Sequence, residues 1–166
     1  MQRIILWIVV AVVAGFVLIQ ILPFGRNHTN PPVVAEPQWD GLQTRALAAR
    51  ACFDCHSNES VWPWYSNIAP VSWLITHDVD EGRSKLNFSE WGVVRAGRGS
   101  EGEEGEEGEG RPGGGERGEG DDVVHLVRSG EMPPWYFVLL HPNAKLTDAE
   151  KEALIQGLQA SGVQGN

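Results

Sequence analysis

Both cysteines of this 166-residue chain lie within one pentapeptide, Cys52-Phe53-Asp54-Cys55-His56. The spacing C-x-x-C-H is that of covalent haem attachment. In a helix, Cys52, Cys55 and His56 would stand at i, i+3 and i+4 and share one face, presenting two thiols to haem vinyl groups and an imidazole to the iron. The alternatives are a thiol-redox pair or half of a zinc site. A zinc site needs about four ligands, the chain has no second cysteine pair, and no βαβ pattern surrounds the motif. The motif therefore favours one haem c per chain.

The N-terminal residues 4–22 form an uncharged run of nineteen residues whose one strongly polar side chain is Gln20. As a helix, this run would span roughly 28 Å, close to the thickness of the hydrocarbon core of a bilayer. It is longer than the apolar part of a cleaved signal peptide. We therefore expect residues 1–24 to be an uncleaved transmembrane anchor. Because covalent haem is attached outside the cytoplasmic membrane, the rest of the chain is predicted to be periplasmic, on a single-pass protein of the bacterial inner membrane.

The net charge of −9 comes from one segment. Residues 101–122 hold ten acidic residues and two arginines, whereas the remainder has 12 acids and 11 bases. The sequence shows no basic patch of the kind that binds nucleic acid. The surrounding Gly/Glu-rich residues 95–120 are low in complexity and are predicted to be a disordered insertion. The proline-rich residues 25–38 are predicted to be an extended tether in which His28 is solvated.

Helical patterns account for most of the remaining chain, residues 39–160. The expected helices cover residues 39–55, with Asp40 as N-cap and the C-x-x-C-H motif at the end; residues 70–81, stopped by Gly82; the stretch from Asp121 or Asp122 to Gly130; and a last helix opened by the capping box Thr147-Asp-Ala-Glu150. Residues 131–136 are expected to be a non-helical loop. No strand pattern of any length is present outside the apolar run, so the predicted fold is all-α.

Met132 is the candidate for the second axial ligand of the iron. It is the only methionine besides the initiator, and its thioether is a soft ligand that raises the reduction potential when paired with histidine. Pro133 biases Met132 towards an extended backbone and stiffens the loop. The alternative ligand is His77, which would lower the potential. The aromatic residues Trp62, Trp64 and Tyr65 are expected to supply apolar wall for the macrocycle.

Several short motifs, taken together, resemble the bacterial haem-binding domain family of monohaem c-type cytochromes. The matching residues are Cys52-Phe-Asp-Cys-His-Ser57, Trp62-Pro-Trp-Tyr-Ser66, Ala69-Pro-Val-Ser-Trp73, His77, Glu81-Gly-Arg83, Leu86-Asn-Phe-Ser89, Met132-Pro-Pro134 and Leu140-His-Pro142. The resemblance covers about residues 39–160, interrupted by residues 95–120. It implies a cytochrome c-like fold whose first and last helices pack together around the haem, thioether bonds at Cys52 and Cys55, and His56 as proximal ligand. Gly157 stands where a bulky residue is expected, which suggests a looser terminal helix.

These features predict a membrane-tethered one-electron carrier of the bacterial cell envelope, rather than an enzyme with its own substrate. Its partner would be another redox protein of the envelope, which the sequence does not identify. The alternative is a haem-based sensor or binding module in which an open sixth position takes a gas such as CO or NO.

Overall fold

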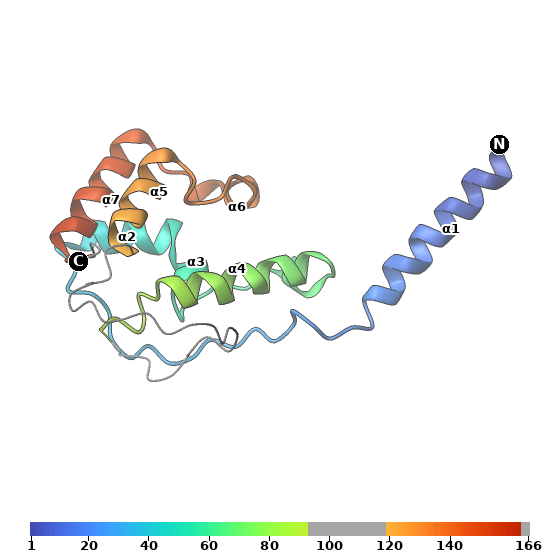
Figure 1. Cartoon of the computed structure of the whole chain (residues 1–166), viewed down its shortest axis with the longest axis horizontal. Helices are drawn as coiled ribbons and strands as arrows, with labels where there is room; N and C mark the ends of the chain where they lie inside the picture. The colour runs from blue at the N-terminus through green and yellow to red at the C-terminus, as the bar shows by residue number, and fades with distance from the viewer. Residues whose placement is uncertain (93–118, 164–166) are drawn as a thin grey trace, which may run out of the picture.

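The computed structural model describes residues 1–92 and 119–163, and within them the fold is all-helical, as predicted (Figure 1). The elements are α1 (Gln2–Ile19), α2 (Leu42–Ala51), α3 (Phe53–His56), the 3-10 turn η1 (Trp64–Asn67), α4 (Val71–Lys85), α5 (Glu119–Ser129), α6 (Trp135–Leu140), the 3-10 turn η2 (Pro142–Ala144) and α7 (Asp148–Ala160). In these two stretches, extended pairing is limited to one isolated bridge between Ala35 and Glu90. The predicted disordered segment, residues 95–120, lies outside the described residues except for its last two, which begin α5.

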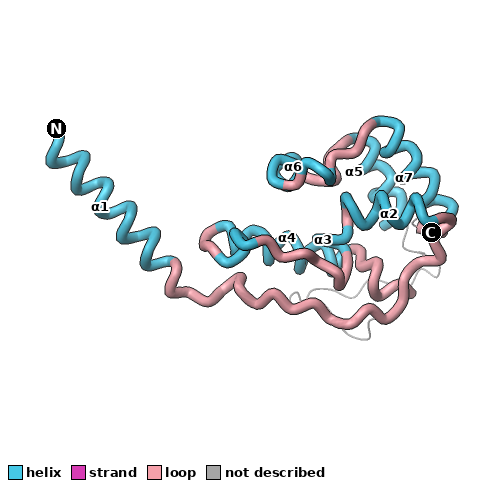
Figure 2. Tube along the Cα trace, turned by 180° about the vertical axis from the view of Figure 1, so that it is seen from behind, coloured by secondary structure: helices cyan, strands magenta, loops and turns pink. Residues whose placement is uncertain are grey.

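α1 stands apart from the other helices (Figure 2), and after Gln2 and Arg3 at its start all its residues are apolar. None of its residues is buried, and its mean hydropathy is 2.4. At 1.5 Å per residue, its 18 residues extend about 27 Å, which is close to the hydrocarbon thickness of a bilayer. By length and composition, α1 is therefore a helix that could cross a membrane.

The hydrophobic core lies where α2 and α5 pack against α7. It is also closed by Phe53 of α3 and by Phe88 in the loop after α4, whose ring centroids are 5.6 Å apart. The buried apolar side chains that α2, α5 and α7 contribute are Leu47, Ala48, Ala51, Val124, Val127, Leu154, Ile155 and Leu158. The first and last helices of the haem-binding domain thus pack together, as the family resemblance implied.

Gly157 makes the contact between α2 and α7 closer, not looser, so that expectation was wrong. An added Cβ at Gly157 would overlap the Thr44 side chain on α2. Thr44 and Gly157 are both buried. A glycine at the crossing lets the two helix backbones approach each other, and the surrounding leucines supply the apolar area that a bulky residue would have supplied.

Several predicted helix boundaries were also wrong. The N-cap of α2 is Gly41 rather than Asp40. α4 continues to Lys85, and Gly82 lies buried inside it instead of ending it. The predicted loop 131–136 is two residues shorter, because α6 begins at Trp135, directly after its N-cap Pro134. The capping box of the last helix is confirmed: the Thr147 side chain accepts from the backbone N–H of Glu150, and the Glu150 carboxylate accepts in return from the N–H of Thr147.

The predicted tether, residues 25–38, runs across the surface of the domain and is hydrogen-bonded to it. The backbone N–H of Ala35 donates to the carbonyl of Ser89 over 3.1 Å. His28 stacks on the ring of Trp62, with centroids 4.4 Å apart, so the prediction that it is solvated was wrong. These contacts hold residues 25–38 against two loops, the one that follows the C-x-x-C-H motif and the one that follows α4.

Candidate haem-binding site

The C-x-x-C-H motif forms a short helical turn of its own. α2 ends at Ala51, and Cys52 adopts a non-helical conformation with φ −123° and ψ −35°. The backbone then turns again into α3, where the N–H of His56 donates to the carbonyl of Cys52 over 2.8 Å. The sequence predicted that the motif would end the first soluble helix, and this was wrong. The helix breaks at Cys52, the first residue of the motif, and the other four residues form α3. This break redirects α3 from α2 towards α4, against which it packs.

Gly82 allows α3 and α4 to come into backbone contact. An added Cβ at Gly82 would lie 2.6 Å from the carbonyl oxygen of Cys55, which is closer than real Cβ contacts. Only a residue without a side chain fits at this crossing. The second half of the attachment motif is therefore held directly against the middle of α4.

The same crossing orients the imidazole of His56. Its Nδ1 lies 3.1 Å from the carbonyl oxygen of Gly82 and 3.1 Å from that of Leu86. Because carbonyl oxygens only accept hydrogen bonds, Nδ1 carries the proton and Nε2 is left with a free lone pair. Burial lowers the pKa of His56, which favours the neutral ring. A neutral imidazole whose Nδ1–H donates to a backbone carbonyl is the usual arrangement of a histidine that ligates a metal.

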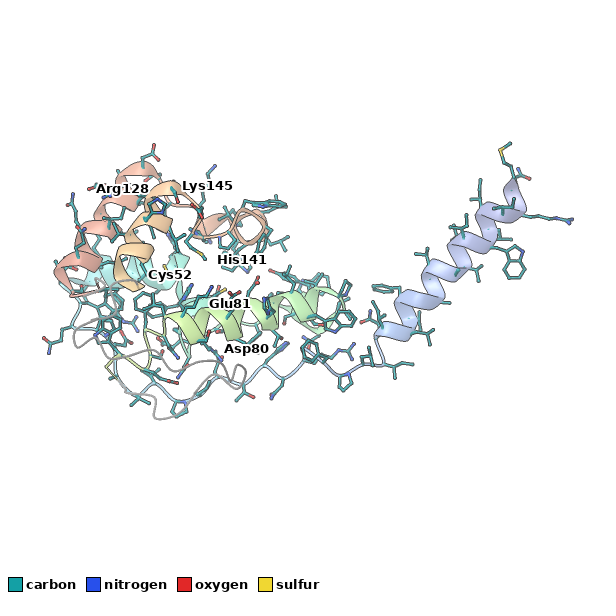
Figure 3. All side chains as sticks on the ribbon, in the orientation of Figure 1. Cys52, Asp80, Glu81, Arg128, His141 and Lys145 are labelled. Carbon is teal, nitrogen blue, oxygen red and sulfur yellow. The ribbon has the colours of Figure 1, made fainter. Side chains whose placement is uncertain are left out.

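Two adjoining cavities form a cleft between α3 and α4 on one side and the α5–α6 loop and α6 on the other. Their volumes are about 220 and 310 Å³, and they share Asp54, Cys55, Asp78, Tyr136 and Phe137 as lining residues. Together they fall in the range of roughly 300–1,000 Å³ that holds ligands and cofactors. Figure 3 shows His141, which follows α6, on the side of that helix that faces α4, where Glu81 lies.

The larger cavity brings His56 and Met132 together, although 75 positions separate them in the sequence. Both residues line it, with Ala51 and Cys55 beside them. The backbone N–H of Met132 donates to the carbonyl of Leu126 over 3.0 Å, which fixes the start of the loop to α5. An imidazole nitrogen and a thioether sulfur could thus approach an iron in this cavity from two elements.

His77, the alternative ligand, lies elsewhere. Its side chain is 70% exposed, and its Nε2 is 3.5 Å from a carboxylate oxygen of Glu81. It lines neither cavity. In this structure it is a surface residue of α4 rather than a group that faces the cleft.

Two of the three aromatic residues that were expected to form the wall of the haem site line the cleft, and one does not. Trp62 and Tyr65 line the smaller cavity. Trp64 is 76% exposed and lines neither cavity, so its assignment to the wall was wrong. The reason is that Trp64 and Tyr65 are adjacent in η1 and point in different directions, so that only Tyr65 is turned towards the cleft.

Residues of α6 complete the cleft, and the sequence analysis missed them. Phe137 and Tyr136 line both cavities, and His141 lines the smaller one. Two side-chain hydrogen bonds connect the walls: Tyr136 donates to Asp78 over 3.1 Å, and the hydroxyl of Tyr65 lies 3.2 Å from Nε2 of His141. The apolar, aromatic run after Pro134 was the signal that could have identified a helical wall here.

The surroundings of the two thiols of the motif disfavour the thiolate form. Burial, together with the neighbouring Cys55, raises the pKa of Cys52 to about 12, and burial together with Asp78 and Asp54 raises the pKa of Cys55 to about 12. Thiol–disulfide exchange depends on a thiolate with a lowered pKa. Neither thiol thus has the lowered pKa on which thiol-redox catalysis, one of the alternatives for a C-x-x-C motif, depends.

An all-helical domain with a half-buried C-x-x-C-H turn, an oriented histidine and a largely apolar cleft defines a haem-binding protein. The chain belongs to the haem-binding domain family, whose match covers residues 14–160. A search of curated proteins and a search of solved structures each found no significant match.

Proposed function

We propose that this chain is a membrane-anchored monohaem c-type cytochrome that transfers single electrons in the bacterial cell envelope. The observation that carries the proposal is the placement of His56 and Met132 around one cavity, with Nδ1 of His56 bonded to backbone carbonyls. Nε2 of His56 and the thioether sulfur of Met132 would then be the two atoms that bind an iron.

In this proposal, Cys52 and Cys55 would hold the cofactor through thioether bonds. His56 and Met132 would be the two protein ligands of its iron. When bound, the haem supplies the one-electron couple of its iron, and a histidine–methionine pair raises the potential of that couple relative to two nitrogen ligands. The protein residues fix the ligands and exclude water from the cleft. With only two cysteines in the chain, there is one attachment site and hence one haem c.

The position of α1 supports attachment to the inner membrane. Its length and uniform apolarity suit a single span, and covalent haem attachment takes place outside the cytoplasmic membrane, which would put residues 25–166 in the periplasm. The partner is then another redox protein of the envelope. The absence of charge from Ile4 to the end of α1 and the lack of buried residues in this helix favour lipid, rather than protein, as its surroundings.

The test is expression with export in a strain that has the haem-attachment machinery. We expect an intact mass that includes one haem and a reduced spectrum with the band of thioether-linked haem. Wild-type protein should also show the far-red charge-transfer band of methionine bound to iron(III), and Met132→Ala should lose it.

His77→Ala is the matched control, because His77 is exposed and lines neither cavity. This variant should keep the far-red band. A colourless protein with two titratable thiols would refute the proposal. Rapid CO binding to the reduced wild type without a ligand-displacement step would refute the six-coordinate carrier and point to a gas-binding module.

A further inference from the structure

Gln20, the one strongly polar side chain of the apolar run, fixes the end of α1 to the haem-binding domain. Its amide Nε2 donates to the carbonyl of Ala69 over 2.9 Å, and its Oε1 accepts from the N–H of Ala69 over 3.0 Å. The same oxygen accepts from Nη2 of Arg26 over 3.1 Å. A side-chain amide that pairs with both backbone groups of one residue makes a two-point contact, which restrains direction as well as distance.

The chain after Gln20 continues this contact instead of leaving the domain. Gly25, with φ +73°, lies so close to α4 that an added Cβ would be 2.6 Å from the carbonyl oxygen of Ser72. The hydroxyl of Thr76 donates to the carbonyl of Gly25 over 3.1 Å. The junction between α1 and α4 is therefore packed, and α1 has a set direction relative to the domain (Figures 1 and 2).

Two segments of the domain that are far apart in the sequence have no charged residues and expose large apolar side chains. Residues 61–77 and 132–144 contain no Asp, Glu, Lys or Arg. From η1, the start of α4 and α6 they expose a set of side chains that we call the apolar rim: Trp64, Val71, Leu74, Trp135, Leu139 and Leu140. Trp135 is 77% exposed and Leu139 is 72% exposed. A soluble monomer rarely exposes so many large apolar side chains together, and such a surface usually marks an interaction site.

The apolar rim lies on the side of the domain where α1 leaves it. In Figures 1 and 2, α6 and the N-terminal end of α4 are directed towards α1, whereas the core helices α2, α5 and α7 are on the far side. Exposed tryptophans and leucines without charge are the side chains that enter the interface between lipid headgroups and acyl chains. A rim that continues from the end of a transmembrane helix would meet this interface directly.

We propose that the apolar rim rests on the surface of the bilayer around α1, so that the haem cleft opens towards the membrane. The inference rests on the proposed membrane span of α1. The lipid bilayer is the occupant that fits best, because the start of α4, which carries part of the rim, adjoins the end of α1 and the rim has no charge to pair with a protein partner. Val71, Leu74 and Leu140 also line the cleft, so the rim residues that lie outside it are Trp64, Trp135 and Leu139. The redox partner would then reach the cleft from within or along the membrane.

The test is photolabelling of the full-length holoprotein in phosphatidylcholine nanodiscs. A fraction of the lipid carries a diazirine on the acyl chain near the glycerol, and adducts are located by peptide mass spectrometry after illumination. We expect adducts on α1 and on peptides from residues 61–77 and 132–144. The peptide with Leu42, which is 89% exposed on α2, is the internal control and should remain unlabelled.

Adducts on α1 without adducts on the apolar rim would overturn the inference and leave the membrane anchor intact. Absence of adducts on α1 would instead refute the proposed span itself. An unlabelled rim in nanodiscs that hold two copies of the chain would show that a second copy covers it, which also overturns the inference.

Two variants connect the labelling to the contacts described. Trp135→Ser combined with Leu139→Ser removes apolar surface at two residues that line neither cavity, and should lose the adducts on residues 132–144 with an unchanged haem spectrum. Gln20→Leu keeps the apolar run apolar but removes the two hydrogen bonds between Gln20 and Ala69. It should reduce labelling of the rim without reducing that of α1. Unchanged rim labelling in Gln20→Leu would show that these two hydrogen bonds do not orient the domain.

Discussion

Replacement of Gly82 by alanine tests whether the crossing of α3 and α4 sets the geometry of the site. The added methyl group would lie 2.6 Å from the carbonyl oxygen of Cys55, 3.1 Å from its carbonyl carbon and 3.2 Å from its Cβ. The nearest atoms belong to the backbone, so no side-chain rotation can relieve the contact. α3 and α4 must move apart.

The expected cost follows from two opposing terms. Overpacking of a tight contact costs about 1–3 kcal/mol, and a contact with backbone belongs at the upper end of this range. Alanine in place of glycine in a helix interior gains about 1 kcal/mol. The hydrogen bond from His56 to Gly82 weakens, although the carbonyl of Leu86 remains as an acceptor. We therefore expect Gly82→Ala to lower the free energy of unfolding by about 1–2 kcal/mol.

The assay is urea unfolding of the detergent-solubilised holoprotein, followed by far-UV circular dichroism and by the haem absorption band. Gly15→Ala is the matched control, because Gly15 is also helical and a Cβ there meets nothing within 4 Å. It should leave the unfolding curve of the haem-binding domain unchanged. Because His56 is oriented by the displaced carbonyl, Gly82→Ala should also alter the haem spectrum of the folded protein.

A Gly82→Ala protein that is as stable as the wild type, with the same spectrum, would refute the reasoning. It would mean that α3 and α4 do not cross as closely as described. The orientation of His56 would then need another cause.

Two further predictions concern the contacts of α7. Gly157→Ala should destabilise the fold by about 1–2 kcal/mol, because its overlap with Thr44 outweighs the gain of alanine in a helix. Adding Thr44→Ala should restore part of the loss, which a double-mutant cycle in urea would measure; additive effects would contradict the contact. The hydrogen bond from the backbone of Thr147, together with Arg50, lowers the pKa of Glu150 from 4.5 to about 2. Its contribution to stability is therefore complete above pH 4.5 and is lost as the pH falls towards 2. Glu150→Gln should flatten unfolding free energies measured across this window, and an unchanged slope there would argue against the pairing.

The sequence alone indicated a haem-binding protein and named the residues that could hold the haem, because these depend on residue types at short range. The spacing of Cys52, Cys55 and His56 is local, and so is the capping box of Thr147 and Glu150 that opens α7. The uniform apolarity of α1 follows from composition. These features depend on residues close together in the chain. The structure contains both α1 and the capped start of α7 as helices, whereas Cys52 of the motif is non-helical.

Tertiary contacts decided the features that the sequence analysis missed or misjudged. Gly82 looked like a helix stop, but it continues α4 because Cys55 packs against it. Gly157 suggested looseness, but it meets Thr44 across a tight crossing. Local propensity treats a glycine as a weak point of a helix, whereas a neighbouring backbone can make it the only residue that fits.

The pairing of residues across the cleft likewise could not be read from the chain. Met132 and His77 were both candidates, and only the fold places Met132 at the cavity of His56 and leaves His77 on the surface. The sequence determined which groups could bind a haem, because chemistry belongs to the side chain. The tertiary structure decided which of these groups meet, because the distance between residues far apart in the chain depends on how the helices pack.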